Sequence, residues 1–308
     1  MYKREYFKLR TSLTNFLPDE LSGYAEWLKE IKALARFGHA VNEELCFCDR
    51  LPVPDYLQKS NLSTVLCNYE INHTLADQGY QTRNIISDDP RASFIDIARQ
   101  LQNANAIDVT SCIPRPLGIS SSVHIGPYSF VHPEVRIDDD VVIGSNCTIH
   151  KGSWLQRGVA IGDGTVIGTT GINAYRSNDG RILDFPHLSG LIIEENTQIG
   201  SNCILVRGIL TSTAIEENVV IGNLCNIGHG VNIKEMCWIS SGCIVGGHTH
   251  IGEKSNIGVG VVIRDNLTVG DRAQIGMGSV VGKNVQDKSS VFGNPARLVP
   301  NLKSGPER

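Results

Sequence analysis

Aliphatic residues recur at every sixth position from Ile215 to Val281. All twelve positions of this series hold Ile or Val, and glycine follows eight of them. An α-helix repeats its faces every 3.6 residues and a half-buried strand alternates every second residue, so neither explains a period of six. A period of six is typical of a parallel β-helix, in which each hexapeptide forms a short strand and a corner. Three hexapeptides complete one triangular coil, so residues 18 positions apart are expected to stack one strand spacing, ~4.8 Å, apart.

The same period begins earlier, at Ile119, and continues through nine hexads to Ile167. Residues 168–190 then break it with Gly, Asn, Asp and Pro at turn-forming places, which predicts a long inserted loop. A loop of this length inside a regular solenoid indicates a functional role. The period resumes at Ile193 and slips once more around 208–214.

Residues 1–112 lack the period and predict a small α+β domain, joined to the repeats by a stiff Ile-Pro-Arg-Pro junction. Hexapeptide helices are left-handed as a class, so a left-handed parallel β-helix is expected over 113–298, followed by a short tail over 299–308. The fold class is therefore mainly β. In the first domain, helices are predicted over 21–37 and 92–101, the second capped by Asp88 or Asp89, and strands over 44–48, 64–69 and 84–87.

The composition and charge of the chain argue against nucleic-acid-binding, secreted and membrane-spanning proteins. A formal charge of −4 and a pI near 6.1 give no indication of a nucleic-acid partner. The charged start of the chain is not followed by an apolar stretch, and no run of about 18 apolar residues occurs, so neither a signal peptide nor a membrane span is expected. We therefore expect a cytoplasmic protein.

The chain contains nine cysteines. Five of them lie four positions after an aliphatic position of the period, in a slot that faces inward beside a corner: Cys147, Cys203, Cys225, Cys237 and Cys243. They are expected to be small buried side chains in a reducing compartment. Cys46 and Cys48 lack CxxC spacing and a second pair, so no metal site is expected.

A β-helix has a filled core, so chemistry must take place at its corners and inserted loops. His229 lies two positions after Ile227, at a corner, and Gly247 lies 18 positions later at the equivalent corner of the next coil. An imidazole can take the proton from an attacking amine or hydroxyl, and a glycine N–H can hold the oxyanion of a tetrahedral intermediate. This pair therefore suits acyl transfer. From the residues alone, a solvated surface histidine is the commoner explanation.

Several segments resemble one family. Residues 215–233 (IEENVVIGNLCNIGHGVNI) and 242–247 (GCIVGG) are similar to the active-site coils of the UDP-3-O-acylglucosamine N-acyltransferases of lipid A synthesis. The inserted loop over 168–190, followed by Arg207-Gly208-Ile209-Leu210, resembles the long loop of that family. Segments between Cys46 and Ala98 also follow the family's order, so the resemblance covers roughly residues 44–298.

The resemblance implies a role for several residues. His229 would be the catalytic base, Gly247 the oxyanion donor and Asn223 an active-site asparagine. The substrate-binding residues implied or expected are Phe47 and Tyr56, whose rings would stack on uracil, with Tyr175, His248 and Asn266. The chain departs from the family at Asn266, where a second active-site histidine is common, so His248 and Asn266 would hold the substrate or the substrate differs.

The end of the chain predicts a different acyl donor. The family continues into a helical extension that engages acyl carrier protein, whereas Gly293-Asn294-Pro295-Ala296-Arg297 resembles the closing motif of hexapeptide acetyltransferases that use acetyl-CoA. Acetyl-CoA is therefore expected as co-substrate, with no tightly bound cofactor. Candidates for the coenzyme A groove are Gly258, Gly276, Gly278 and Arg297, the last for a phosphate.

The sequence thus favours an N-acetyltransferase that acts on a UDP- or dTDP-linked amino sugar for a surface polysaccharide. The alternative is the family's own reaction, with an acyl group delivered by acyl carrier protein. Two further readings remain open: a zinc hydratase of the γ-carbonic anhydrase type, whose histidine spacing is not matched, and a non-catalytic scaffold. A homotrimer is expected from the class, because one outer face of a β-helix gives too shallow a cleft.

Overall fold

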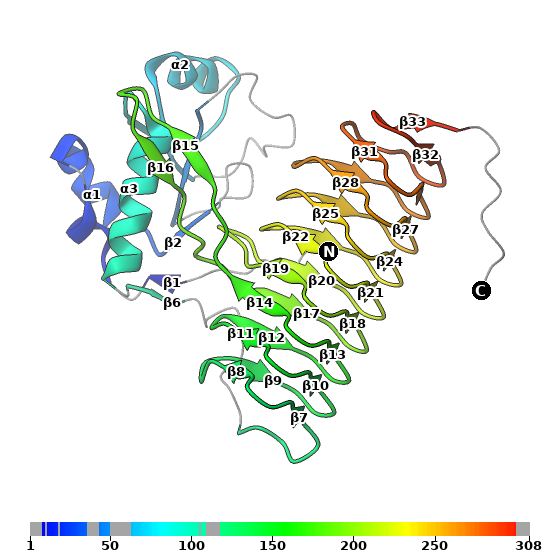
Figure 1. Cartoon of the computed structure of the whole chain (residues 1–308). Helices are drawn as coiled ribbons and strands as arrows, with labels where there is room; N and C mark the ends of the chain where they lie inside the picture. The colour runs from blue at the N-terminus through cyan, green and yellow to red at the C-terminus, as the bar shows by residue number, and fades with distance from the viewer. Residues whose placement is uncertain are drawn as a thin grey trace. The chain divides into compact units, whose positions relative to one another are not determined.

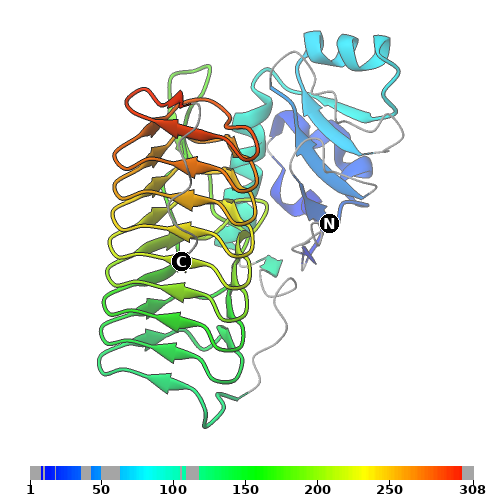
Figure 2. The ribbon, with the colours of Figure 1, turned by 90° about the vertical axis from the view of Figure 1, so that its right-hand side faces the viewer.

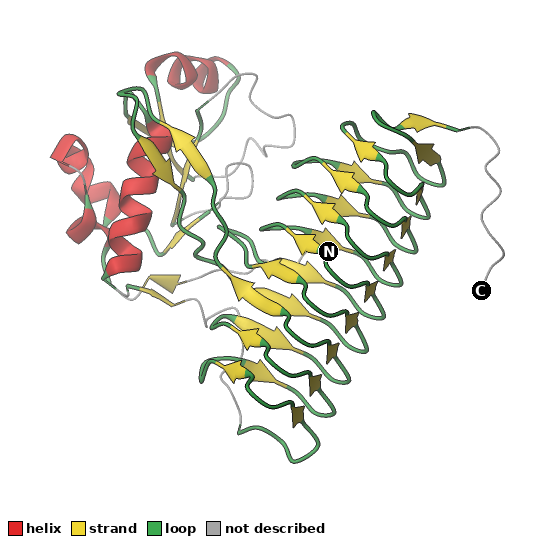
Figure 3. Cartoon of the chain, viewed as in Figure 1, coloured by secondary structure: helices red, strands yellow, loops and turns green. Residues whose placement is uncertain are grey.

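A computed structural model describes residues 8–9, 11–17, 19–35, 43–49, 63–104, 106–108 and 118–299. The chain divides into two compact units. The first comprises Met1–Cys112, Ile172–Leu188 and Ile209–Thr211, and the second comprises Ile113–Gly171, Ser189–Gly208 and Ser212–Arg308. The central part of the inserted loop therefore belongs to the first unit. All helices of the described residues also belong to that unit (Figure 3).

The second unit is a solenoid of short strands that form three parallel sheets (Figure 1). The first sheet contains β7 (His124–Ile125), β10 (Val142–Ile143), β13 (Ala160–Ile161), β18 (Gln198–Ile199), β21 (Val220–Ile221), β24 (Trp238–Ile239), β27 (Asn256–Ile257), β30 (Gln274–Ile275), β32 (Ser290–Phe292) and an antiparallel last strand, β33 (Arg297–Leu298). The second contains β8 (Phe130–Val131), β11 (Thr148–Ile149), β14 (Val166–Thr169), β19 (Ile204–Val206), β22 (Asn226–Ile227), β25 (Ile244–Val245), β28 (Val262–Ile263) and β31 (Val280–Val281). The third contains β9 (Arg136–Ile137), β12 (Ser153–Leu155), β17 (Leu191–Ile193), β20 (Thr213–Ile215), β23 (Asn232–Ile233), β26 (His250–Ile251) and β29 (Thr268–Val269). The predicted fold class, a left-handed parallel β-helix of hexapeptides preceded in the sequence by a small α+β domain, is confirmed.

The coils stack in the register that the period predicts (Figure 2). Ile227 pairs with Val245, and Val245 with Ile263, so a regular step along the solenoid advances 18 positions, whereas the last step, from Ile275 to Val291, advances 16. Two steps are longer. Leu155 pairs with Ile193 across the inserted loop, and Ile193 pairs with Ile215, which accounts for the slip around 208–214.

The core of the β-helix consists of stacked Ile, Val and Leu side chains, with cysteines between them. All five cysteines of the inward slot are buried, as predicted. Their thiols reach backbone carbonyls, and that of Cys225, for example, donates to the Ser240 carbonyl oxygen at 3.2 Å. The first aliphatic position, Ile119, is 57% exposed, and it lies before β7, the first strand of the described solenoid.

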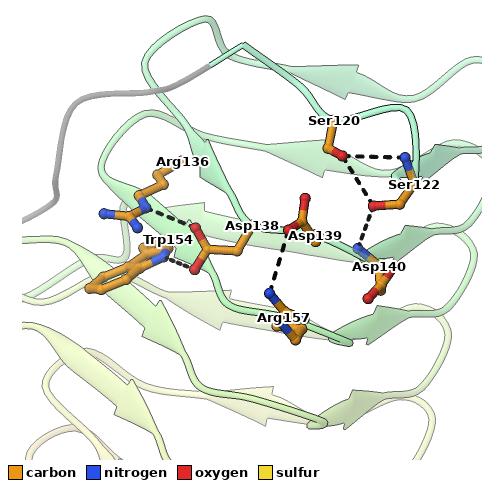
Figure 4. A network of polar contacts seen from close by, with 8 residues as sticks. All are labelled: Ser120, Ser122, Arg136, Asp138, Asp139, Asp140, Trp154 and Arg157. Atoms are coloured by element: carbon orange, nitrogen blue, oxygen red, sulfur yellow. Dashed lines mark hydrogen bonds and ion pairs between the residues drawn. The ribbon is translucent and has the colours of Figure 1, made fainter.

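Polar ladders join the coils on their outer surface (Figure 4). In the first coils, the Asp138 carboxylate accepts hydrogen bonds from Arg136 Nε and Trp154 Nε1, both at 2.9 Å. The Arg136 guanidinium also lies 4.3 Å from the centre of the Trp154 ring. Side chains on neighbouring coils therefore contact one another outside the sheet as well as within the core.

The first unit has a four-stranded parallel sheet with helices. The sheet order is β2 (Ala33–Leu34), β3 (Glu44–Phe47), β4 (Thr64–Cys67) and β5 (Arg83–Ile86), and a separate antiparallel pair is formed by β1 (Lys8–Leu9) and β6 (Ile107–Asp108). The helices are the 3₁₀ segments η1 (Leu13–Phe16) and η2 (Asp19–Tyr24), then α1 (Ala25–Leu28), α2 (Tyr69–Asp77) and α3 (Pro90–Asn103). The inserted loop adds a hairpin of β15 (Ala174–Arg176) and β16 (Ile182–Asp184).

Two sequence predictions in this unit need correction. The helix predicted over 21–37 is wrong: it is broken into η2 and α1, and the chain then extends so that Ala33 and Leu34 pair with β3. Leu28, Ile31 and Leu34 are buried as a helix would bury them, but pairing with a strand distant in the sequence overrides local propensity. The strand predicted over 64–69 ends at Cys67, because Asn68 caps α2 through its side chain. The other predicted helix forms α3, and Asp89 is its cap.

Candidate active site

One corner of the β-helix brings the predicted base and oxyanion donor together. β22, β25 and β28 stack in register, so His229, Gly247 and Asp265, each two residues beyond its strand, occupy one corner on three successive coils. The backbone links neighbouring coils here, since the His248 N–H donates to the His229 carbonyl oxygen at 2.8 Å. We call His229, Gly247 and Asp265 the corner column.

The imidazole of His229 covers the α-carbon of Gly247. A β-carbon on Gly247 would lie 2.5 Å from Cε1 and 2.6 Å from Nε2 of that ring, closer than real β-carbons approach other atoms. Gly247 is buried and His229 is half-buried. The absence of a side chain at 247 is therefore what allows the imidazole to occupy this position.

The Gly247 amide is available for a ligand. Among the described residues its N–H makes no hydrogen bond, although its carbonyl oxygen accepts from the Asn266 N–H at 2.9 Å. A buried amide without a partner costs free energy, so such a group is uncommon away from functional sites. An N–H beside an imidazole is the arrangement that acyl transfer requires.

His248 lies against His229 on the next coil. The two ring centroids are 4.8 Å apart and the ring planes meet at 75°, an edge-to-face contact. The backbone of His248 is left-handed (φ 57°), as is that of Asn266 one coil later (φ 56°). Gly230 leaves room for the second ring, because a β-carbon there would lie 2.5 Å from His248 Nδ1. The structure thus places the predicted residues His248 and Asn266 beside the corner column.

Burial and charge act on His229 in opposite directions. Burial lowers the pKa of the imidazole, and the nearby Asp265 carboxylate opposes that effect. The imidazole is therefore neutral at pH 7 and can accept a proton. Arg207 lies at the same corner one coil earlier, because Leu205 pairs with Ile227. It is buried, and burial lowers its pKa.

Asp265 and Arg207 were not among the predicted site residues. Both lie two positions after an aliphatic position of the second sheet, as His229 does, so the same offset would have found them. Asn223, in contrast, lies on the preceding corner. Its side-chain oxygen accepts from the Ser201 N–H at 2.8 Å, and its own N–H donates to Ser241 Oγ at 3.1 Å. Within one chain, it is therefore part of a structural ladder and is not brought to His229.

In the first unit, Phe47 and Tyr175 hold an arginine between them. The Arg91 guanidinium carbon lies 5.4 Å from the centre of the Phe47 ring and 5.0 Å from that of Tyr175. Phe47 also packs on Phe94, with ring centroids 5.0 Å apart. The Tyr175 hydroxyl donates to Asp89 at 2.9 Å, and burial together with that carboxylate raises the pKa of Tyr175 to about 12.

These contacts bear on the proposed nucleotide site. One face of each ring is already in contact with Arg91, so a base that stacks on Phe47 would use another face or displace the guanidinium. Tyr56, the second predicted stacking residue, lies outside the described residues. The roles of these side chains in binding stay predictions.

The glycines predicted for a coenzyme A groove lie near the end of the solenoid. Gly276 is covered by the Phe292 ring, which occupies the space that a β-carbon would take. Gly258 packs on the backbone of the next coil, since a β-carbon there would lie 2.6 Å from Met277 N, whereas Gly278 (φ 68°) faces open space. Arg297 is exposed in β33. Of these four residues, Gly278 and Arg297 are the ones open to a ligand.

The described residues contain no group of three or more His, Cys, Asp or Glu side chains that could hold a metal ion. Within the same residues, every helix is too short or too polar to cross a membrane.

Comparisons with known proteins agree with this architecture. The family described as bacterial transferase hexapeptide (six repeats) matches residues 118–151, and the hexapeptide repeat of succinyl-transferase matches residues 190–210 and 248–283. The UDP-3-O-acylglucosamine N-acyltransferase of Coxiella burnetii is 30% identical over 232 residues, which cover 66% of this chain and 65% of that protein. The enzyme of the same name from Caulobacter vibrioides is 35% identical over 99 residues, 32% of this chain and 29% of that protein. The chain thus spans less than two thirds of the length of these relatives.

Among solved structures, the UDP-N-acetylglucosamine acyltransferase of Francisella novicida is similar in fold. Its TM-score is 0.53 at 23% identity, over 60% of this chain and 67% of that one. At this level of identity the likeness concerns the fold alone, and it supports the β-helix described above.

Proposed function

We propose that the chain, whose repeats are similar to those of the bacterial hexapeptide transferases, transfers an acyl group from a thioester to the amine of a UDP-linked amino sugar. The observation that carries the proposal is the corner column, where the His229 imidazole lies against Gly247, whose backbone N–H makes no hydrogen bond to any described residue. Two relatives named UDP-3-O-acylglucosamine N-acyltransferase support the choice of an amino sugar as acceptor.

The proposed reaction uses His229 and Gly247 directly. The sugar amine attacks the thioester carbonyl carbon while His229 takes a proton from the nitrogen. The carbonyl oxygen becomes an oxyanion, which accepts a hydrogen bond from the Gly247 N–H. The C–S bond then breaks, and the departing sulfur receives the proton from the imidazolium. The products are an amide on the sugar and a free thiol.

The names of the relatives favour the family's own reaction, with acyl carrier protein as donor, over the acetyl-CoA expected from the sequence. The acetyl-CoA donor depends on the closing motif over 293–297 and on Gly278 and Arg297, which are open to a ligand. We therefore propose the carrier-bound acyl group as donor. Acetyl-CoA is the second candidate.

The two donors can be distinguished with the purified chain. UDP-3-O-acylglucosamine is offered with an acyl carrier protein thioester or with acetyl-CoA, and the acylated amine is measured by mass spectrometry. A dTDP-linked amino sugar serves as a second acceptor. Transfer from the carrier protein to the UDP-sugar supports the proposal, whereas transfer from acetyl-CoA alone overturns the proposed donor. Failure of every thioester to acylate any amine would contradict the proposed function as a whole.

A homotrimer is proposed on one further observation. One outward-facing column of the second sheet, next to the corner column, holds Ile204, Asn226, Ile244 and Val262 on successive coils, and its three aliphatic members are 41%, 50% and 36% exposed. Burial of this column against a second copy would remove apolar surface from water. Light scattering is expected to give about three times the 33.6 kDa of one chain, and a single-chain mass would contradict the trimer.

A further inference from the structure

Aspartates at the corners of the β-helix repeatedly accept a hydrogen bond from the coil below. Asp163 Oδ1 accepts from the Ser145 N–H at 2.6 Å, and Asp271 Oδ1 accepts from the Glu253 N–H at 3.0 Å. In both pairs the donor lies 18 positions before the acceptor and two positions after its own strand. An aspartate at this place in a corner thus has a regular structural function, which is to satisfy the amide one coil below it.

Asp265 lies 18 positions after Gly247, as Asp163 and Asp271 do after their donors, but its carboxylate does not accept a hydrogen bond from the Gly247 N–H. The Gly247 N–H has no partner among the described residues, and Asp265 Oδ2 instead accepts from Asn266 Nδ2 at 2.6 Å. Asn266 is left-handed (φ 56°), a conformation that asparagine tolerates better than most residues. Gly247, between Asp265 and His229, contributes no side chain that would separate the carboxylate from the imidazole.

We propose that Asp265 is a positioning residue for His229, and that Asn266 holds its carboxylate away from the Gly247 amide so that this amide stays free for the oxyanion. The inference rests on the proposed acyl transfer and names two further residues of the same site. Asn266 would then act on the site through Asp265 rather than by contact with the substrate.

The charges around His229 explain how the Asp265 carboxylate could assist the base. His229 becomes an imidazolium when it takes the proton from the amine, and a negative charge nearby stabilises that form. The other ionisable groups at the corner are Arg207 on the coil before His229 and His248 on the coil after it. Both can carry positive charge, so of these three neighbours only Asp265 favours the imidazolium. Because Asp265 is exposed, its effect is expected to be modest.

The Asp265→Asn variant tests the carboxylate. NMR titration of the His229 Cε1–H, which needs no substrate, is expected to give a lower pKa than in the wild type. With substrate, kcat should fall about two- to fivefold, and the acidic limb of kcat/KM should move to lower pH. Asp163→Asn is the matched control, because that carboxylate bonds an amide on another corner, and it should leave both measurements unchanged. An unchanged His229 titration in Asp265→Asn would overturn the positioning function, whether or not the chain acylates an amine.

The Asn266→Gly variant tests whether Asn266 keeps the Gly247 N–H free by holding the Asp265 carboxylate. Glycine keeps the left-handed backbone but removes the donor to Asp265, so the carboxylate is free to accept from the Gly247 N–H as at the other corners. We expect slower hydrogen exchange of the Gly247 amide, and a lower kcat with little change in KM. Asn218→Gly, another left-handed asparagine (φ 58°), is the control. If the Gly247 amide exchanges at the wild-type rate in Asn266→Gly, Asn266 does not keep it free.

Discussion

The imidazole of His229 lies against the bare α-carbon of Gly247, 18 positions further along the chain, so that a β-carbon at 247 would stand 2.5 Å from Cε1. This relationship follows from the repeat, since one complete coil separates the two residues. The stacking of the coils, rather than a loop or a bound group, thus defines the geometry of the candidate site. A rigid solenoid is well suited to hold a base and an oxyanion donor in fixed positions.

Gly247→Ala is expected to displace the His229 ring, because the new methyl group and Cε1 cannot both keep their places. A shift of about 1 Å in a reacting group costs on the order of a hundredfold in rate, so kcat should fall by about that factor while the fold is retained. Gly282→Ala is the matched control, because a β-carbon there meets no atom within 4 Å. Steady-state kinetics and circular dichroism of both variants would test this, and equal rates for the two would contradict it.

His229→Ala is expected to lower kcat by about 10²- to 10⁴-fold, the usual contribution of a general base. His124→Ala, which removes an exposed histidine from β7, should have the activity of the wild type. The assay is release of the free thiol from the acyl donor. Wild-type turnover by His229→Ala would exclude this imidazole as the base and would favour a scaffold function for the β-helix.

The pH dependence of acyl transfer should reflect the burial of His229. The base acts when the imidazole is neutral, and burial lowers its pKa below the ordinary value of about 6.5. Activity is therefore expected to rise with pH through a midpoint below 6.5 and then to reach a plateau. A profile of kcat/KM from pH 5 to 8 would measure the midpoint, and a midpoint above 6.5 would be inconsistent with a buried base.

Asp89 is expected to matter for the stability of the first unit. Its carboxylate caps α3 through the Ala92 N–H at 3.0 Å and accepts from the Tyr175 hydroxyl and the Asn178 N–H of the inserted hairpin. Asp89→Ala removes the cap and leaves two donors without their acceptor, at a cost of about 2 kcal/mol.

Tyr175→Phe removes one of these bonds alone and should cost about 1 kcal/mol. Urea unfolding monitored by circular dichroism would give both values. Hydrogen exchange should also become faster in the hairpin of the Asp89 variant. If Tyr175→Phe destabilises the chain as much as Asp89→Ala does, the helix cap contributes nothing.

The repeat made the β-helix predictable. A period of six fixes both which residues face inward and which stack, so the contact of His229 with Gly247 follows from counting positions. Asp265 and Arg207 follow from the same count but have no signal of their own, because charged residues at solenoid corners are usually solvated. That the Gly247 amide has no partner among the described residues depends on where the Asp265 side chain points, which spacing does not encode.

The first unit was less predictable, since its contacts are distant in the sequence. Helical spacing of Leu28, Ile31 and Leu34 is compatible with one long helix, and only the pairing of β2 with β3 shows why the helix ends. Similarly, the hydrogen bond between Tyr175 and Asp89 joins residues 86 positions apart. Neither residue has a local pattern that points to the other.

The membership of Ile172–Leu188 and Ile209–Thr211 in the first unit has a consequence for biosynthesis. A ribosome that has finished Cys112 has not yet supplied the hairpin whose Tyr175 and Asn178 bind Asp89, nor Leu188, Ile209 and Leu210, which pack in the core of that unit. The first unit therefore cannot complete its fold until residues 172–188 and 209–211 have been synthesised, and by then the first coils of the solenoid have already left the ribosome. In nascent chains arrested at successive lengths, protease resistance of the earlier-made part should appear only after Thr211 has left the exit tunnel.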